Sequence, residues 1–267
     1  MKILYKIYAR LFAREAFRKL NYHILRFALS GLGILNYYNL KISGEEYFIT
    51  NILPKFINNN PVFFDVGANI GNYSKLLSER FPYSFIHIFE PHPKNYNILK
   101  KQKFSSKTFI NQLAISDDNG VVKIYDYEDK DGSSHASLHK GVIEDIHKSK
   151  SVSHEVKKDT IDNYIRSNEI DQVDLLKIDI EGHELSALKG ALDTIKSSKA
   201  KIIHFEFNEM NVESRVFFKD FYDLLEDYTL YRLLPKSLLK LGDYKPIHHE
   251  IFAYQNIIAI RDNSDNL

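Results

Sequence analysis

One stretch decides the fold expected of this chain: Val62-Phe63-Phe64-Asp65-Val66-Gly67-Ala68-Asn69-Ile70-Gly71-Asn72-Tyr73-Ser74. It begins as an apolar strand, passes through a turn that holds two glycines, and ends at the start of a helix. A second apolar run, residues 85–89, follows and ends on Glu90 and Pro91. A carboxylate about twenty residues after a strand–glycine–helix turn is typical of a site that binds the ribose of a nucleotide.

The spacing of the glycines indicates which kind of nucleotide. A dinucleotide site needs G-x-G-x-x-G, so that the backbone can approach a pyrophosphate. Here Gly67 and Gly71 are four residues apart, Asn69 lies between them, and Asp65 precedes them. A carboxylate so close repels a pyrophosphate and suits a cationic or zwitterionic ligand. S-adenosylmethionine is such a ligand, because it carries a ribose, a sulfonium and an amino acid but no phosphate. The turn therefore predicts this cofactor and a methyl transfer.

Strand and helix patterns alternate from Pro61 onward, which predicts an α/β domain with a largely parallel sheet and helices on both faces. The expected strands are residues 62–66, 84–89, 107–113, 121–127, 152–158, 173–179, 200–207, 228–233 and 252–261. The expected helices are residues 71–80, 93–102, 160–168, 183–197 and 213–227. The strands near 124 and 155 are expected to form a local antiparallel excursion, with the polar segment 129–151 as a long loop between them.

The composition is that of a globular protein, with 44% hydrophobic and 27% charged residues. A net charge of +1 gives no general attraction to nucleic acid. The absence of cysteine excludes disulfides, thiolate metal sites and a cysteine nucleophile. No apolar run reaches the length of about eighteen residues that a membrane span needs. Basic residues interrupt the N-terminus, which therefore does not fit a signal peptide, and we expect a cytoplasmic protein.

Residues 1–43 are expected to form a separate helical segment ahead of a methyltransferase domain at residues 44–267. Apolar residues recur at helical spacing between residues 4 and 12 and indicate an amphipathic helix. Lys2, Lys6, Arg10 and Arg14 recur every four residues and form a basic stripe. We favour a helix that packs across the domain or contacts a second copy. Docking of residues 1–40 on an anionic membrane is the alternative. A further helix is expected at residues 45–57.

The expected cofactor contacts lie at the ends of neighbouring strands. Glu90 is expected to accept hydrogen bonds from both ribose hydroxyls. Ala114 and Ile115 are expected to bound the adenine, whose edge would bond to Gln112 or Ser116. The full set of predicted cofactor-binding residues is Asp65, Gly67, Ala68, Asn69, Gly71, Asn72, Ser74, Glu90, Pro91, Gln112, Ala114 and Asp179.

A second segment, residues 173–184, ends an apolar strand with Asp179, Glu181, His183 and Glu184. Three interpretations are open. His183 acts as a general base; Asp179 and Glu181, with or without His183, hold a divalent cation; or the cluster only caps the next helix. We favour base chemistry or substrate positioning and assign no residue as a metal ligand. Glu206 ends the next strand and is expected at the same edge of the sheet, where a carboxylate is costly unless it is partnered or functional. The predicted catalytic residues are therefore His183, Asp179, Glu181 and Glu206.

These segments together resemble the FkbM family of S-adenosylmethionine-dependent methyltransferases. The resemblance rests on residues 64–74, 89–91, 113–116 and, most specifically, on Leu175-Leu176-Lys177-Ile178-Asp179-Ile180-Glu181-Gly182-His183-Glu184, with residues 159–162 as its lead-in. It covers residues 44–261 and leaves out the first forty. It implies a Rossmann-like, class I methyltransferase sheet of seven strands, cofactor contacts from the glycine turn and Glu90, and O-methylation, often of a sugar or polyketide hydroxyl. It identifies neither the acceptor nor a base.

The sequence thus predicts an O-methyltransferase that acts on a hydroxyl of a small molecule or glycan, most readily a sugar. A nicotinamide-dependent dehydrogenase is one alternative, which the glycine spacing disfavours. A non-catalytic protein that keeps the cofactor site is another. A homo-oligomer and a peripheral position at the inner face of the membrane stay open, and no nucleic-acid partner is expected.

Overall fold

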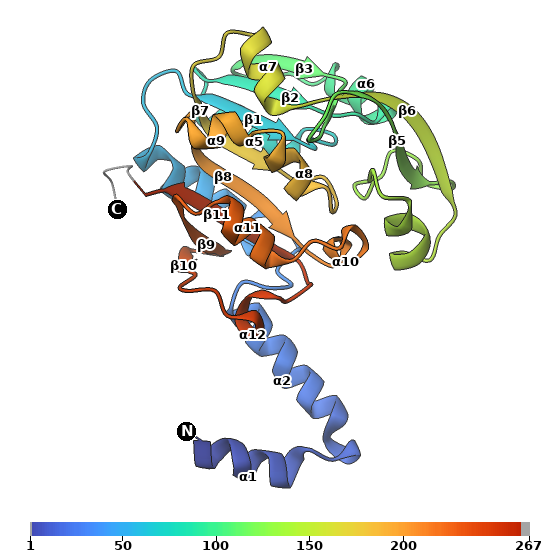
Figure 1. Cartoon of the computed structure of the whole chain (residues 1–267), viewed down its shortest axis with the longest axis vertical. Coiled ribbons are helices and arrows are strands. Elements are labelled where there is room, and N and C mark those ends of the chain that lie inside the picture. Colours follow the sequence, from blue (N-terminus) through green and yellow to red (C-terminus); the bar gives the residue numbers. More distant parts are fainter. Residues whose placement is uncertain (1, 263–267) are drawn as a thin grey trace.

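A computed structural model describes residues 2–262, and its centre is an eight-stranded sheet (Figure 1). The strands lie in the order β10 (Ser237–Lys240), β9 (Tyr228–Leu234), β11 (Gln255–Arg261), β8 (Ala200–Phe207), β7 (Val173–Ile178), β1 (Val62–Val66), β2 (Phe85–Phe89) and β3 (Lys107–Asn111). The five from β8 to β3 are parallel, whereas β11 is antiparallel to both of its neighbours. The predicted α/β fold is confirmed. Strand β10 adds an eighth strand to the expected seven, because the chain turns back after β9 and pairs with it.

The sheet is buried on both faces, since successive side chains of a strand point to opposite sides. On β1, Phe64 packs with the helices α7 (Ile161–Ser167), α8 (Glu184–Lys189), α9 (Leu192–Lys196) and α11 (Phe218–Leu224). Its neighbour Phe63 packs on the other face, with α5 (Asn72–Arg80), α6 (Pro93–Leu99) and the segment 48–53. All parallel strands therefore bring their carboxyl ends to one edge, between two helical layers.

The remaining helical elements are short. They are α3 (Leu40–Ser43), α4 (Glu45–Tyr47), α10 (Met210–Ser214), α12 (Pro246–His249), the 3₁₀ turns Glu15–Phe17 and Leu53–Lys55, and the π-helical turns Phe48–Ile52 and Val142–Ile146. The expected helix at 45–57 is thus three consecutive helical turns of different kinds.

Two predicted helices are wrong in extent. The expected helix 183–197 is broken into α8 and α9 around Gly190, where an added Cβ would lie 2.0 Å from the carbonyl oxygen of Ser116. The expected helix 213–227 starts only at Phe218, because Arg215 adopts a left-handed backbone conformation that ends α10. The Glu250 carboxylate then accepts the backbone N–H groups of Phe218 and Lys219 at 2.9 and 3.0 Å.

A smaller sheet stands beside the main one at the carboxyl ends of its strands (Figure 1). It holds β4 (Ala114–Ile115), β6 (Ser151–Asp159) and β5 (Gly120–Tyr127), and β5 pairs with β6 in antiparallel register. The expected antiparallel excursion is confirmed. The long polar loop between β5 and β6 is only partly loop, because Val142 and Ile143 of its π-helical turn are fully buried beside Met210.

The N-terminal helices α1 (Lys2–Phe12) and α2 (Arg18–Gly31) extend away from the body of the molecule (Figure 1). None of their residues is buried, and Leu4 and Phe27 are 67% and 76% exposed. The expectation that the basic amphipathic helix packs across the domain is therefore wrong. No described helix has the length and apolar character needed to cross a membrane. Residue 1 and residues 263–267, the ends of the two predicted segments, lie outside the described residues.

Candidate active site

The glycine turn after β1 brings the ends of β1 and β7 together. Gly67 has a φ of 80°, and a Cβ added there would lie 1.8 Å from the carbonyl oxygen of Asp179. Gly71 has a φ of 88°, and its Cβ would lie 2.6 Å from the side chain of Leu99 on α6. Both positions require glycine, because other residues are strained at positive φ and lack the space. The two glycines therefore serve first of all to let segments of this chain approach one another closely.

Glu90 closes one side of the turn, as the sequence predicted. Its Oε2 accepts the backbone N–H of Asn69 at 2.7 Å, and its Oε1 accepts that of His92 at 2.8 Å. Glu90 is 5% exposed, and burial raises the pKa of its carboxyl group to about 8. Each oxygen has a second lone pair, so that the ionised group can accept one further hydrogen bond per oxygen. This pair of acceptors fits a vicinal diol such as that of a ribose.

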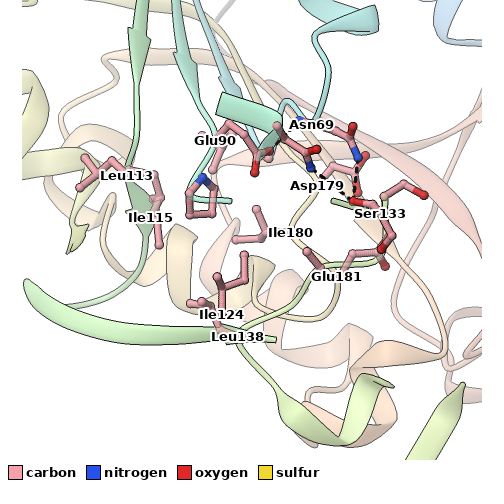
Figure 2. Close-up of a pocket in the computed structure, with 17 residues that line it drawn as sticks. Asn69, Glu90, Leu113, Ile115, Ile124, Ser133, Leu138, Asp179, Ile180 and Glu181 are labelled. Atoms are coloured by element: carbon pink, nitrogen blue, oxygen red, sulfur yellow. Dashed lines mark hydrogen bonds between the residues drawn. The ribbon is translucent and has the colours of Figure 1, made fainter. Parts of the chain in front are cut away.

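A first cavity lies next to Glu90 (Figure 2). Its apolar side is formed by Leu113, Ala114, Ile115, Ile124, Ala136, Leu138 and Ile180. Its polar side holds Asn69, Glu90, Ser133, Asp179 and Glu181, which Figure 2 shows on the side away from Leu113 and Ile115. An apolar slot that ends at a diol-binding carboxylate fits an adenosine, so the residues present fit S-adenosylmethionine.

The predicted cofactor residues fall into three groups. Gly67, Asn69, Glu90, Pro91, Ala114 and Asp179 line the first cavity. Ala68 and Asn72 line a second cavity beside it. Asp65, Gly71, Ser74 and Gln112 line neither of the two. Gln112 is exposed, and Ser116 is turned away toward Asp117 and His183, so the predicted bond from either side chain to an adenine edge has no geometric support.

Asp65 and Ser74 act one layer behind the cavity. The fully buried Asp65 accepts the Ser74 hydroxyl at 2.6 Å and lies 3.4 Å from Lys177 Nζ. Lys177 Nζ also lies 3.2 Å from Asp179 Oδ2. Burial opposes the charge of Lys177, but Asp179, Asp65 and Glu45 outweigh it and raise its pKa above the usual range. Sequence analysis missed Lys177, although a lysine inside an apolar strand was its signal.

The second cavity continues from the first. The two share Gly67, Asn69, Ser133, Ser134, Asp179 and Glu181 as lining residues. Its other walls come from distant parts of the chain: Tyr37 and Glu45 precede the domain core, Glu206 and Asn208 end β8, and Tyr254 precedes β11. The two cavities therefore adjoin, and together they form a cleft at the carboxyl edge of the parallel strands.

Two of the acids that line this cleft, Glu181 and Glu206, have strongly perturbed pKa values. Strands β7 and β8 pair Ile178 with Phe205, which places Glu206 at the same edge as Asp179, as expected. Burial and then the neighbouring Asp179 carboxylate raise the pKa values of Glu181 and Glu206 well above the usual range. Asn208 Nδ2 donates a hydrogen bond to Glu206 Oε1, while Glu181 Oε2 has no hydrogen-bond partner among the described residues. This pair is the strongest proton acceptor candidate in the cleft.

His183 lines neither cavity, which disfavours its predicted role as a base. Its Nε2 lies 3.0 Å from Ser116 Oγ, and its Nδ1 lies 3.2 Å from His139 Nε2. Burial lowers its pKa to about 4. Both ring nitrogens are thus engaged by other segments of the chain. The geometry places His183 as a link between the end of β4 and the long loop, in which His139 lies.

The divalent-cation interpretation of Asp179, Glu181 and His183 also lacks support, because these side chains do not form a metal-binding group among residues 2–262. Such a group is formed instead by His92, Asp131 and His154, with both imidazole Nε2 atoms 2.8 Å from Asp131 Oδ1. His92 Nδ1 accepts the backbone N–H of Lys94, so its Nε2 carries the hydrogen. The three side chains therefore form a hydrogen-bonded cluster that fixes the loop near Ser133. The Ser133 carbonyl accepts a hydrogen bond from Asn69 Nδ2 at 3.1 Å.

Comparison with known proteins agrees with this geometry. Residues 65–232, more than half of the chain, match the family described as "Methyltransferase FkbM domain". The hexuronic acid methyltransferase AglP of Haloferax volcanii is 25% identical over 164 residues, which cover 61% of this chain and 62% of AglP. The methyltransferase sdnD of Sordaria araneosa is 28% identical over 156 residues, which cover 49% of this chain and 60% of sdnD. The chain thus spans less than two thirds of both relatives.

Among solved structures, the precorrin-6y C5,15-methyltransferase from Geobacter metallireducens is similar, with a TM-score of 0.42 and 12% identity. The match covers 85% of this chain and 94% of that one.

Proposed function

The chain belongs to the FkbM methyltransferase family and its cofactor is S-adenosylmethionine, and we propose that it methylates a hydroxyl group of a sugar or glycan. The observation that carries this proposal is that the two cavities adjoin and share six lining residues. A transfer enzyme must hold donor and acceptor in contact and in line. The first cavity fits the donor, and the second is open to an acceptor at the same junction.

The side chains around the first cavity orient the donor. Glu90 accepts the two ribose hydroxyls, and the apolar residues around Ile115 enclose the adenine. Asp179, held by Lys177 from behind, presents its carboxylate at the junction of the cavities. The bound cofactor supplies a methyl group on a positively charged sulfur, and the surrounding carboxylates stabilise that charge in the ground state. Rate enhancement must therefore come chiefly from alignment and from proton removal.

Proton removal is assigned to the pair of Glu181 and Glu206. Burial and then repulsion from Asp179 raise the pKa values of both acids, which keeps a proton on the pair at a higher pH than on an isolated carboxyl group. The ionised member is a stronger base than an ordinary carboxylate for the same reason. An acceptor hydroxyl at the junction would give its proton to this pair as the carbon–oxygen bond forms.

A sugar acceptor is supported by the walls of the second cavity and by a relative. Tyr37 and Tyr254 meet edge to face, with ring centroids 5.9 Å apart, and Asn208 and Glu206 provide planar polar groups beside them. Aromatic faces combined with planar hydrogen-bonding groups suit a ring that is apolar on one face and hydroxylated at its edge. The relative AglP is named for its action on a hexuronic acid.

The proposal is tested with the full chain and labelled S-adenosylmethionine. Methyl ethers on a sugar acceptor, identified by mass spectrometry of the product, are the expected result. Thermal stabilisation by S-adenosylhomocysteine but not by NAD is expected as well, because only a ligand that binds the folded state raises the melting temperature. Stabilisation by NAD would favour the dehydrogenase alternative. Stabilisation without transfer to any acceptor would favour a non-catalytic protein.

We extend the proposal to the helices α1 and α2 of the predicted segment 1–43, as the part that holds a cytoplasmic enzyme peripherally at the inner face of the membrane. Helix α1 exposes Ile3, Leu4 and Ile7 by 72%, 67% and 50%. No acidic residue occurs before Glu15, whereas four basic residues recur along the same stretch. An exposed apolar face with flanking basic residues fits an anionic bilayer surface, to which each lysine or arginine adds about 1 kcal/mol.

Vesicle flotation tests this extension. The intact chain should float with vesicles that contain phosphatidylglycerol and sink with neutral ones. A variant with Lys2, Lys6, Arg10 and Arg14 changed to Glu should sink with both. Equal flotation of the two chains would rule out the membrane contact. Absence of flotation together with a dimer that the variant loses would move the assignment to homo-oligomer contact.

A further inference from the structure

The second cavity is lined by more acids than bases. Five carboxyl side chains line it, those of Glu45, Asp179, Glu181, Glu206 and Glu209. Glu181 Oε2 is buried without a hydrogen-bond partner among the described residues, so an acceptor that can donate a hydrogen bond would satisfy it. An acceptor that brings a carboxylate would instead add negative charge to a cavity in which burial and the Asp179 carboxylate already raise the pKa values of Glu181 and Glu206.

The lysines of the cavity do not offset this charge where an acceptor would bind. Lys177 is buried, and its Nζ lies 3.2 Å from Asp179 and 3.4 Å from Asp65, so its charge is already shared. Lys130 is the other lysine of the lining, and it lies in the exposed part of the loop. No arginine contributes to the lining of this cavity. A bidentate clamp for a carboxylate is therefore absent from this part of the described structure.

Resting on the proposed function, we infer that the acceptor is an uncharged or amine-bearing sugar and that the second cavity discriminates against acidic sugars. Tyr37 packs on the apolar face of the sugar ring, and the carboxyl groups of Glu45 and Glu181 receive hydrogens from its hydroxyl or ammonium groups. Glu209, an exposed residue of the lining, sets the charge at the entrance.

Three probes that share one ring separate the possibilities: methyl glucoside, methyl 2-amino-2-deoxyglucoside and methyl glucuronide. With the full chain and labelled S-adenosylmethionine, transfer to the better of the first two should exceed transfer to the glucuronide by roughly tenfold or more. That ratio is the scale of one like-charge contact near a protein surface. A glucuronide that equals or exceeds the other probes would overturn the inference and leave the proposed function intact. Transfer to none of the three would count against a sugar acceptor, and so against the proposed function itself.

Glu209→Arg tests whether charge is the cause. The change should raise transfer to the glucuronide at least threefold relative to the glucoside, because it adds a cation at the entrance. Glu226→Arg is the matched control: Glu226 is exposed on the turn before β9, at the opposite edge of the sheet, and should leave the ratio unchanged. An unchanged ratio in Glu209→Arg would show that charge at the entrance does not set specificity and would overturn the inference.

Discussion

The two halves of the cleft are built in different ways. The first cavity takes its acidic groups from turns that directly follow the neighbouring strands β2 and β7, beside the glycine turn after β1, so strand register places them, and of its polar side chains only Ser133 and Ser134 come from the long loop. The second cavity gathers residues from distant segments, and its aromatic wall joins Tyr37 to Tyr254. A local pattern can therefore encode the cofactor half, whereas the acceptor half depends on how the whole chain folds. Substitutions in the two halves should have correspondingly different effects.

The largest effect is expected at Gly67. Both its positive φ and the nearby backbone of Asp179 require glycine at this position. Gly67→Ala places a Cβ against the Asp179 carbonyl and strains the positive φ. Together these should cost about 4 kcal/mol of folding stability. Urea unfolding of both proteins, followed by circular dichroism, measures the loss.

Gly31→Ala is the control for this change. Nothing lies within 4 Å of a Cβ added at Gly31, and alanine favours the helix that it ends. Its stability should equal that of the parent or exceed it slightly. A Gly67→Ala protein of normal stability that merely binds less cofactor would assign the glycine to the cofactor rather than to the fold.

Glu206→Gln should separate chemistry from cofactor binding, since Glu206 lines only the second cavity. Turnover is expected to fall about a hundredfold, the scale of a lost general base, while the affinity for S-adenosylmethionine stays within twofold. The pKa of Glu206 lies above the usual range, so activity of the parent should rise with pH as the pair of acids loses its proton. That rise should flatten in the variant. Full turnover in Glu206→Gln would remove the base assignment.

Glu90→Ala should have the opposite effect, because it should change cofactor binding first. Loss of hydrogen bonds to a charged group should weaken cofactor binding by about 2 kcal/mol, or roughly thirtyfold, as isothermal titration calorimetry would measure. Asn72→Ala is the matched control, because the sequence predicted Asn72 as a cofactor contact but the structure places it on the second cavity. If both changes weaken the cofactor equally, the division of the cleft into two halves is wrong.

The pKa of Glu90 predicts a smaller effect, a pH dependence of the cofactor affinity of the parent protein. Burial raises this pKa to about 8 in the cofactor-free protein. Hydrogen bonds donated by the ribose hydroxyls would stabilise the ionised carboxylate and so lower the pKa in the complex. The affinity should therefore be greatest above pH 8 and decline as the pH falls from 8 to 6, by roughly tenfold. Calorimetry at several pH values tests the sign. A flat profile would show that Glu90 does not change its charge on binding.

The sequence was sufficient for the features that recur locally. The alternation of apolar strands and helices predicted the sheet. The position of Glu90 directly after β2 predicted that its carboxylate lies beside the glycine turn, as it does. It was insufficient where partners are remote. The carboxylate that starts α11 belongs to Glu250, more than thirty residues later in the chain, and no local pattern announces it.

The same limit applies to the candidate site. Asp65 was predicted as a cofactor contact because it precedes the glycines, but the side chain that it meets is Lys177 of a neighbouring strand. His183 was predicted as a base because acids surround it in sequence, but Asp179 and Glu181 line the cleft whereas the His183 imidazole lies against Ser116 and His139. Proximity along the chain thus identified the right edge of the sheet without distinguishing which side chains face the cleft.

The smallest effect is expected from His183→Ala, which tests that distinction most sharply. Because His183 lines neither cavity, turnover and cofactor affinity should each change by less than about threefold, whereas a base would cost a hundredfold or more. Stability should fall by about 1 kcal/mol, since Ser116 and His139 lose a hydrogen-bond partner. His23→Ala, at an exposed position of α2, controls for loss of an imidazole alone. A hundredfold fall in turnover with unchanged melting and cofactor affinity would return the base to His183. In that case the long loop would have to rearrange when the acceptor binds. The position of His183 outside the cleft would then hold only for the free protein.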